Sequence, residues 1–143
     1  MPGAPSLDLS AAAADLRLAV KLLAQRLRVQ ARPGLSWSQE SVISLLDRKG
    51  TVTVSDLARA EGVRSQSMGS TVASLEAEGL VHREPDPSDG RQTLVSLTEQ
   101  GREVLAQFRE LKQTWLESVI AERLTPDEQQ VLAAAVELLL RLP

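Results

Sequence analysis

Residues 51–97 read TVTVSDLARAEGVRSQSMGSTVASLEAEGLVHREPDPSDGRQTLVSL, and they combine two helical signals with two strand signals. Thr53 is placed to cap the first helical segment, and Gly62 supplies the tight turn that separates it from the second. Two apolar segments, Leu80–His82 and Thr93–Leu97, predict the strands of a hairpin. This order indicates a helix-turn-helix that carries a β-hairpin wing, a fold that places one helix in the major groove of DNA.

The second helical segment, residues 64–78, has one apolar and one polar side. Met68, Val72 and Leu75 recur at helical spacing and form a stripe that a core would bury. The opposite side carries small or uncharged polar residues, namely Gln66, Ser67, Gly69, Ser70 and Ser74. A merely solvated helix usually carries Glu and Lys there, whereas short side chains let the backbone approach base edges and phosphates. We therefore predict a recognition helix; the alternative is a solvated polar helix with no partner.

The polar loop between the two strands, Glu84–Arg91, is dense in turn-forming residues and forms the tip of the predicted wing. Arg91 is placed to reach the minor groove of DNA. Asp89 is placed to support the wing by orienting that guanidinium through a charge-assisted hydrogen bond. Thr51–Val54 alternates Thr and Val, which predicts a short third strand beside the wing.

Long helices are predicted on both sides of this central segment. The first, at residues 9–30, has an apolar seam made of Leu16, Val20, Leu23 and Leu27. A similar stripe continues through two helices at residues 98–142, the second of which starts at the capping sequence Thr125–Glu128. A winged helix alone cannot cover this much apolar surface, so a helical dimer interface is expected.

These elements together predict a mainly α fold with a small β-wing. A length of 143 residues suits one domain, residues 1–143. Within it we expect a winged-helix DNA-binding lobe at residues 36–97, flanked by dimerisation helices at residues 9–30 and 98–142.

The composition excludes several classes of function. The chain has no cysteine and only one histidine, so it has no disulfide, no thiol nucleophile and no cysteine-based zinc site, and neither a metal nor another cofactor is expected. It contains no Ser-x-x-Lys, no Gly-x-Ser-x-Gly and no Gly-rich phosphate loop, so we expect no catalytic residue and no enzyme. It shows neither a signal peptide nor a membrane span, which predicts a soluble cytoplasmic protein without a membrane partner.

The charge is unevenly distributed along the chain. Residues 1–35 carry five Lys or Arg against two Asp or Glu, a local net charge of +3. Residues 36–97 carry six against nine, a local net charge of −3, and the whole chain also has a net charge of −3. This balance argues against a histone-like binder of bulk nucleic acid, and it makes the predicted DNA-binding lobe acidic overall.

The sequence resembles the MarR family of winged-helix transcriptional regulators over essentially its whole length. The similarity is carried by Leu35-Ser36-x-x-Gln39, Asp56-Leu57-Ala58, Gly62-Val63, Leu75-Glu76-x-x-Gly79-Leu80-Val81, and Asp86-Pro87-Ser88-Asp89-Gly90-Arg91 running into Leu94-Val95-Ser96-Leu97-Thr98-x-x-Gly101. The last of these is the most specific, whereas the others are general to winged helices.

The resemblance implies a homodimer, held by the first and last helices, that binds a palindromic site in double-stranded DNA. Family DNA contacts correspond to Arg64, Ser65, Gln66, Ser67, Ser70 and Thr71 on the recognition helix and to Arg91 on the wing. Many members release DNA when a small, often phenolic, anion binds between the dimer helices and the DNA-binding lobe. The residues that we consider for such a pocket are Arg17, Lys21 and Trp37; the alternatives are a solvated helix face for the cations and core packing for Trp37.

Two positions depart from the family pattern and lower the positive charge. Ser70 stands where many relatives have an arginine, and Gly90 stands where many have a basic residue at the wing tip. The absence of cysteine also excludes the thiol-sensing mechanism that some members use.

Two functions therefore remain open at the level of sequence. The first is a homodimeric, sequence-specific transcriptional regulator, a repressor that a small effector releases from DNA. The second is a winged-helix module whose acidic surface binds another protein and has little affinity for DNA. The two differ in what Arg91 does, because only the DNA-binding protein needs that side chain in a minor groove.

Overall fold

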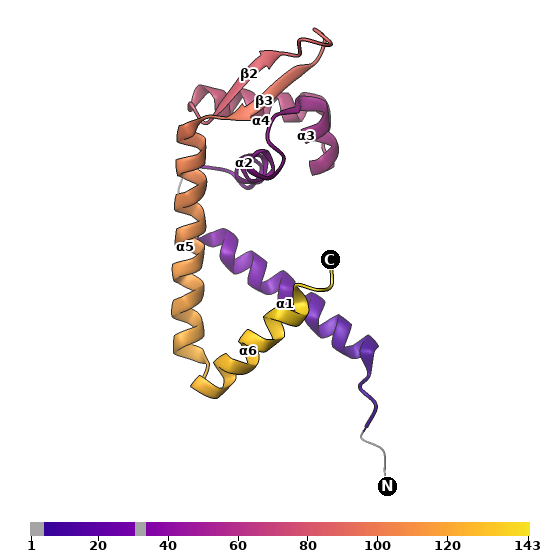
Figure 1. Ribbon diagram of the computed structural model, residues 1–143, viewed down its shortest axis with the longest axis vertical. Coiled ribbons are helices and arrows are strands. Elements are labelled where there is room, and N and C mark those ends of the chain that lie inside the picture. The colour runs from indigo at the N-terminus through magenta and orange to yellow at the C-terminus, as the bar shows by residue number, and fades with distance from the viewer. Residues whose placement is uncertain (1–4, 31–33) are drawn as a thin grey trace. The chain divides into compact units, whose positions relative to one another are not determined.

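The computed structural model describes residues 5–30 and 34–143 (Figure 1). In chain order the elements are α1 (Leu9–Val29), α2 (Trp37–Lys49), β1 (Val52–Thr53), α3 (Val54–Glu61), α4 (Ser65–Ala77), β2 (Val81–Pro85), β3 (Thr93–Leu97), α5 (Glu99–Arg123) and α6 (Pro126–Leu139). The chain forms two compact units: a central unit of residues 32–111, and a flanking unit that combines residues 1–31 with 112–143. Helices with one small three-stranded sheet confirm the predicted fold class.

The helices of the central unit begin and end at residues with a local reason to be there. Ser36 and Gln39 form a capping box at the start of α2, with a Ser36 N–H to Gln39 Oε1 distance of 2.8 Å. The hydroxyl of Thr53 accepts a 3.1 Å hydrogen bond from the backbone of Asp56 at the start of α3. Gly62 ends α3 at a φ of 66°, in the left-handed region that glycine adopts without steric cost. These termini agree with the sequence signals.

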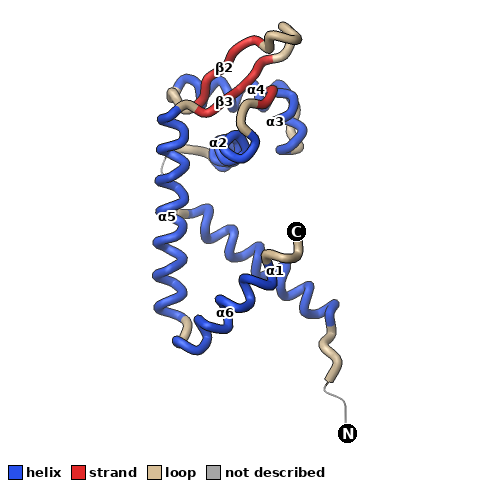
Figure 2. Tube along the Cα trace, viewed as in Figure 1, coloured by secondary structure: helices blue, strands red, loops and turns tan. Residues whose placement is uncertain are grey.

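The wing belongs to an antiparallel sheet with strand order β1-β3-β2. Strands β2 and β3 pair from Val81 opposite Leu97 to Pro85 opposite Thr93. The two-residue strand β1 adds to the other side of β3, with Val52 opposite Val95. The predicted third strand is thereby confirmed. In Figure 2 the long hairpin of β2 and β3 extends past the helices of the central unit.

The hydrophobic core lies in the central unit. The predicted stripe of α4 is confirmed, since Met68, Val72 and Leu75 are all buried. The first half of α5 contributes Phe108, which is among the largest fully buried side chains, together with Val104 and Leu105. Dispersion and burial of apolar area therefore hold α4, the sheet and the start of α5 to one another.

A short junction joins α4, β2 and α5. The Thr98 hydroxyl donates a 2.6 Å hydrogen bond to the Gly79 carbonyl and accepts a 3.0 Å bond from the Gly101 N–H. The Thr98 N–H also bonds the Leu80 carbonyl at 3.1 Å. A Cβ atom on Gly101 would lie 2.1 Å from that carbonyl oxygen, so only glycine permits this close approach.

The helices of the flanking unit bury little on their own. No residue of α1 or α6, both of which are described throughout, is buried. Large apolar side chains are exposed instead, including Leu18, Val20, Leu22, Val29, Val131, Leu138 and Leu140. Among the described residues, no helix is long and apolar enough to cross a membrane.

Candidate nucleic-acid interface

The outward side of α4 is polar, exposed and without intramolecular partners. Ser65, Gln66, Ser67 and Ser70 are all exposed, and none of their side chains takes part in a hydrogen bond within the described chain. Gln66 and Ser70 lie on the side of the helix opposite the buried stripe, because each falls about half a turn from Met68 and Val72. The predicted contact residues of this helix are therefore presented together to solvent, with donors and acceptors available.

The N-terminus of α4 keeps its N–H groups available. Arg64 is the N-cap residue, and no side chain makes a capping hydrogen bond there. Free N–H groups and the helix dipole favour an anion at this position. Within the described residues the Arg64 guanidinium has no ion-pair or hydrogen-bond partner, so a phosphate would meet a cation and a helix N-terminus together.

Thr71 differs from the other predicted contacts. Its side chain is half-buried, and its hydroxyl donates a 3.2 Å hydrogen bond back to the Ser67 carbonyl. Ser74, one turn from Ser70, is also engaged, because its hydroxyl accepts a 2.9 Å bond from Gln39 Nε2 of α2. Thr71 therefore remains a predicted contact, but its hydroxyl is already committed to the helix.

The wing tip is ordered by two aspartates. Asp86 Oδ1 accepts hydrogen bonds from the Ser88 hydroxyl at 2.7 Å and from the Ser88 N–H at 2.9 Å, and these bonds hold the pKa of the Asp86 carboxyl below its usual value. Asp89 Oδ1 accepts from the Arg91 N–H at 3.1 Å and from Arg91 Nε at 3.4 Å. The Arg91 side chain is 93 % exposed, so the structure has the predicted Asp89 contact and leaves the guanidinium open to a partner.

Two contacts that the sequence reasoning missed tie the wing to the helix-turn-helix. Arg83 of β2 forms a 2.8 Å ion pair with Glu76 near the end of α4. This hydrogen bond lowers the pKa of the Glu76 carboxyl and raises that of the Arg83 guanidinium. At the end of the wing loop, just before β3, Gln92 Oε1 accepts a 3.1 Å hydrogen bond from the Ser55 hydroxyl of α3. Opposite charges seven residues apart, across a strand start, were the only signal available for the first contact.

Four arginines of the central unit are paired with carboxylates. The ion pairs are Arg59 with Asp56, Arg83 with Glu76, Arg91 with Asp89 and Arg109 with Asp47. Such exposed pairs contribute little to stability, but they reduce the positive field that a phosphate would meet. The excess of carboxylates in this segment is therefore also reflected in the ion pairs that its arginines form.

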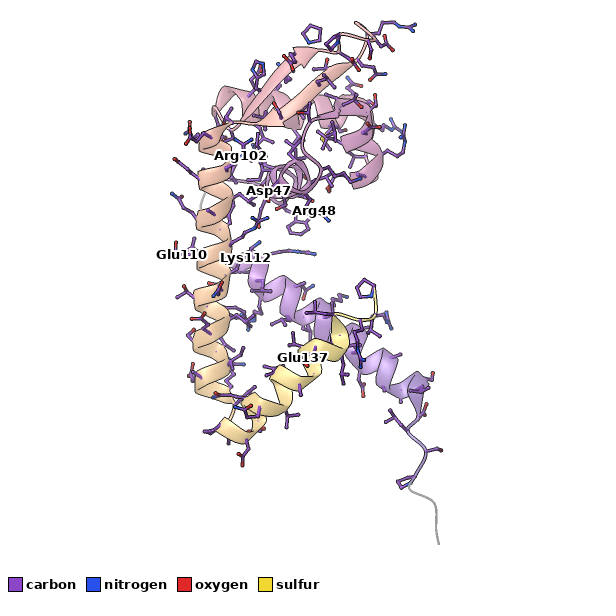
Figure 3. The ribbon with its side chains drawn as sticks, viewed as in Figure 1. Asp47, Arg48, Arg102, Glu110, Lys112 and Glu137 are labelled. Carbon is purple, nitrogen blue, oxygen red and sulfur yellow. The ribbon has the colours of Figure 1, made fainter. Side chains whose placement is uncertain are left out.

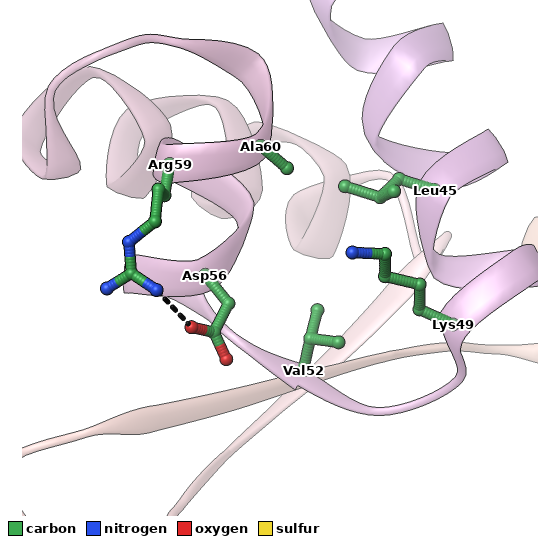
Figure 4. Close-up of a pocket in the computed structure, with 6 residues that line it drawn as sticks. All are labelled: Leu45, Lys49, Val52, Asp56, Arg59 and Ala60. Carbon is green, nitrogen blue, oxygen red and sulfur yellow. Dashed lines mark hydrogen bonds and ion pairs between the residues drawn. The ribbon is translucent and has the colours of Figure 1, made fainter.

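The central unit has two small surface hollows. One, of about 240 Å³, lies between α2 and α3 and is lined by Leu45, Lys49, Val52, Asp56, Arg59 and Ala60 (Figure 4). The other, of about 110 Å³, includes Asp47 of α2 and Arg102 of α5, which are labelled in Figure 3.

The flanking unit has a larger groove, of about 600 Å³, between α1 and the C-terminal half of α5, with Trp115 and Arg123 on its α5 side. None of the predicted pocket residues lines any of these three spaces. Trp37 is 53 % exposed, so the alternative of core packing for it is wrong, while Arg17 and Lys21 are exposed on α1. The effector pocket stays a prediction.

Comparisons with known proteins agree with this architecture. A sequence model of the MarR family matches residues 34–92. The chain is 40% identical over 131 residues to the HTH-type transcriptional regulator ML2140 of Mycobacterium leprae (strain TN). This match covers 91% of each of the two chains. It is 30% identical over 105 residues to the HTH-type transcriptional regulator YdgJ of Bacillus subtilis (strain 168), covering 73% of this chain and 63% of that protein.

Solved structures show the same fold. A putative transcriptional regulator from Pseudomonas aeruginosa PA01 is 38% identical, with a TM-score of 0.81 and coverage of 96% of this chain and 97% of that one. Wild-type MarR from E. coli in its apo form is similar in fold, with a TM-score of 0.73, 23% identity and coverage of 90% and 96%. Because the match to the Mycobacterium leprae regulator spans nearly all of both chains, and the family model covers the segment from α2 to the wing, the chain belongs to the MarR family of transcriptional regulators.

Proposed function

We propose that this protein is a homodimeric repressor that binds a palindromic site in double-stranded DNA. Each α4 enters a major groove, and Arg91 of each wing reaches the neighbouring minor groove. The observation that carries this proposal is the outward side of α4, where Ser65, Gln66, Ser67 and Ser70 are exposed and unpaired beside a free helix N-terminus. In a dimer the two α4 helices would lie about one DNA turn, roughly 34 Å, apart.

The proposal of a dimer rests on the flanking unit. Its helices α1 and α6 expose large apolar side chains along their length, and neither buries a residue. Apolar area of this extent favours association, at about 25 cal/mol for each Å² removed from water. A second copy of the chain supplies the matching surface, since a two-fold interface uses the same helices from both subunits. We propose residues 9–30 and 98–142 as the dimerisation helices.

A small effector would act on the dimer. Family resemblance supports an anionic, aromatic ligand, with Arg17, Lys21 and Trp37 as the proposed pocket residues. Such a ligand favours the dimer geometry to which it binds more tightly, and it releases DNA when that geometry no longer matches the spacing of the two grooves. One related structure is MepR of S. aureus bound to an oligodeoxyribonucleotide, with 18% identity and a TM-score of 0.68, which supports the fold of a DNA-binding protein.

A second candidate function is favoured by the charges. With a net charge of −3 over residues 36–97 and three of its arginines paired with carboxylates, the same fold would suit a module that binds a basic protein surface. In this alternative the Arg91 side chain is not needed for binding.

The test is binding of the purified protein to the DNA that flanks its own gene, with random DNA as competitor and at two salt concentrations. We expect saturable binding that survives the competitor. Arg91→Ala should weaken it by about 1–3 kcal/mol, because the minor-groove contact is lost. Arg48→Ala, which removes the same charge from an exposed position in the last turn of α2, is the matched control and should bind as the wild type does.

The outcome separates the two functions. Equal affinity of the wild type for specific and random DNA, followed by failure to enrich any sequence from a random duplex pool, would overturn the repressor. An Arg91→Ala variant that binds DNA as well as the Arg48→Ala control would remove the wing from the proposal.

A further inference from the structure

One residue of α4 is chemically unlike its neighbours. Within Ser65–Ala77, only Gln66 and Glu76 have side chains long enough to make two hydrogen bonds to one base edge. The Glu76 carboxylate is half-buried and is held by Arg83 at 2.8 Å. Gln66 is exposed, and its amide has no partner within the described chain. Gln66 is therefore the one residue of this helix with a free pair of hydrogen-bonding groups.

Gln66 also stands at the position where a base reader is expected. It is the second residue of α4, and recognition helices contact base edges with their N-terminal residues. Its helical position is nearly opposite the buried stripe, on the same side as Ser70 one turn later. The neighbouring side chains, Ser67, Gly69 and Ser70, are short, so the helix can approach closely enough for the amide to reach the floor of the groove.

The amide selects among the four bases by its pattern of donor and acceptor. In the major groove adenine presents an acceptor at N7 and a donor at N6, which match the glutamine NH₂ and carbonyl respectively. Guanine presents two acceptors, N7 and O6, so the glutamine carbonyl would face a lone pair. Thymine and cytosine each offer one hydrogen-bonding group on this edge, so neither can satisfy both groups of the amide.

We propose that Gln66 reads an adenine at one position of each half-site, and that it is the specificity-determining residue of α4. The inference rests on the proposed DNA-binding function and adds to it the base that this helix requires. The serines around it then make phosphate contacts or single hydrogen bonds, which position the helix and discriminate weakly.

The experiment is selection of binding sites from a random duplex DNA pool by the full-length wild type, Gln66→Ala, Gln66→Arg and Glu78→Ala. We expect the wild type to select an adenine at one position of each half-site. Gln66→Ala should lose that preference by about 5- to 150-fold, the range for one bidentate base contact, and should keep the other positions. Gln66→Arg should select guanine at the same position, because arginine donates to N7 and O6.

Glu78→Ala is the matched control, since it truncates an exposed side chain at the C-terminal end of α4, outside the proposed DNA contacts, and should leave the adenine preference intact. Thermal unfolding of each variant checks that α4 is still folded. A wild type that selects no sequence overturns the proposed function and this inference together. A wild type that selects a site, with Gln66→Ala and Gln66→Arg selecting the same site, overturns the role of Gln66 alone.

Discussion

Gly69 lies in the middle of α4, where the fold has no need of a glycine. Its φ is not in the left-handed region, and a Cβ atom at this position would have no neighbour within 4 Å. A glycine inside a helix costs about 0.5–1 kcal/mol relative to alanine. The described structure contains no steric or conformational reason for this glycine, and close approach of a nucleic acid backbone would supply one.

Gly69→Ala is therefore expected to stabilise the protein and to weaken DNA binding. The free energy of unfolding should rise by about 0.5–1 kcal/mol, because alanine loses less backbone entropy. Thermal unfolding measures the first effect, and titration with the selected DNA site measures the second. Ala73→Gly, one turn further on, is the reverse change and should lower stability by a similar amount. A Gly69→Ala variant with unchanged DNA affinity would show that the DNA backbone does not come close at this residue.

The ion pair between Asp89 and Arg91 illustrates a contact that orients rather than stabilises. The Arg91 side chain is 93 % exposed, and the Nε to Oδ1 distance is 3.4 Å. Pairs of this kind contribute between nothing and about 1 kcal/mol. The consequence of Asp89 is a restricted set of positions for the guanidinium, which reduces the entropy lost when Arg91 enters a groove.

At the scale of the elements, the junction of α4, β2 and α5 links the recognition helix and the wing to the long helix. It consists of the Thr98 hydroxyl between Gly79 and Gly101, and of the close approach of Gly101 to the Leu80 carbonyl. Each contact joins residues near the ends of different elements, so displacement of α5 would move the end of α4 and the start of β2 with it.

Gly101→Ala should destabilise the central unit by about 1–3 kcal/mol, because the new Cβ atom cannot occupy a space 2.1 Å from a backbone oxygen. Chemical denaturation would measure the change in free energy of unfolding. Gly90→Ala is the control, since a Cβ atom there meets nothing within 4 Å and its stability should stay within about 0.5 kcal/mol of the wild type. Equal stability of the two variants would mean that the backbone at Leu80 and Gly101 can move apart to accommodate the new Cβ atom without loss of stability.

At the scale of the whole molecule, α1 and α6 expose apolar side chains that nothing in the described chain covers. Leu138 of α6 is 56 % exposed and Leu18 of α1 is 55 % exposed, although both are apolar. Helices of this kind obtain most of their stability from packing rather than from propensity. The proposed dimer therefore completes the fold of the flanking unit as well as spacing the two DNA-binding surfaces.

Leu138→Glu is expected to disrupt the dimer, because it places a charge in an apolar interface. Sedimentation velocity should show the wild type as a dimer and the variant as a monomer or a much weaker dimer, with binding to a palindromic site lost. Gln130→Glu adds the same charge on the polar side of α6 and should remain dimeric. Dimers of equal strength for both variants would place the interface elsewhere.

The net charge of −3 is also a property of the whole molecule. A chain with few excess cations neutralises few DNA phosphates, and that number sets how strongly the DNA affinity depends on salt. A protein that neutralises few phosphates releases few counterions, so its affinity should fall only modestly as salt rises. Specific base contacts such as that of Gln66 then carry a larger share of the binding free energy.

The sequence by itself determined the elements and their order. Ser36, Thr53 and Gly62 act through hydrogen bonds and φ angles within a few residues, and the alternation of β3 and the stripe of α4 reflect local periodicity. For this reason the helix termini, the third strand, the buried side of α4 and the Asp89–Arg91 contact could all be predicted.

Only the tertiary structure decided which polar side chains form hydrogen bonds or ion pairs within the described chain and which do not. It pairs Glu76 with Arg83 and Ser55 with Gln92, and it engages Ser74 with Gln39. These contacts join residues that packing brings together. The partners are too far apart along the chain for a helical or strand repeat to predict that they meet. The same packing exposes Trp37, and by pairing Glu76 with Arg83 it leaves Gln66 as the long polar side chain of α4 with no partner in the described chain.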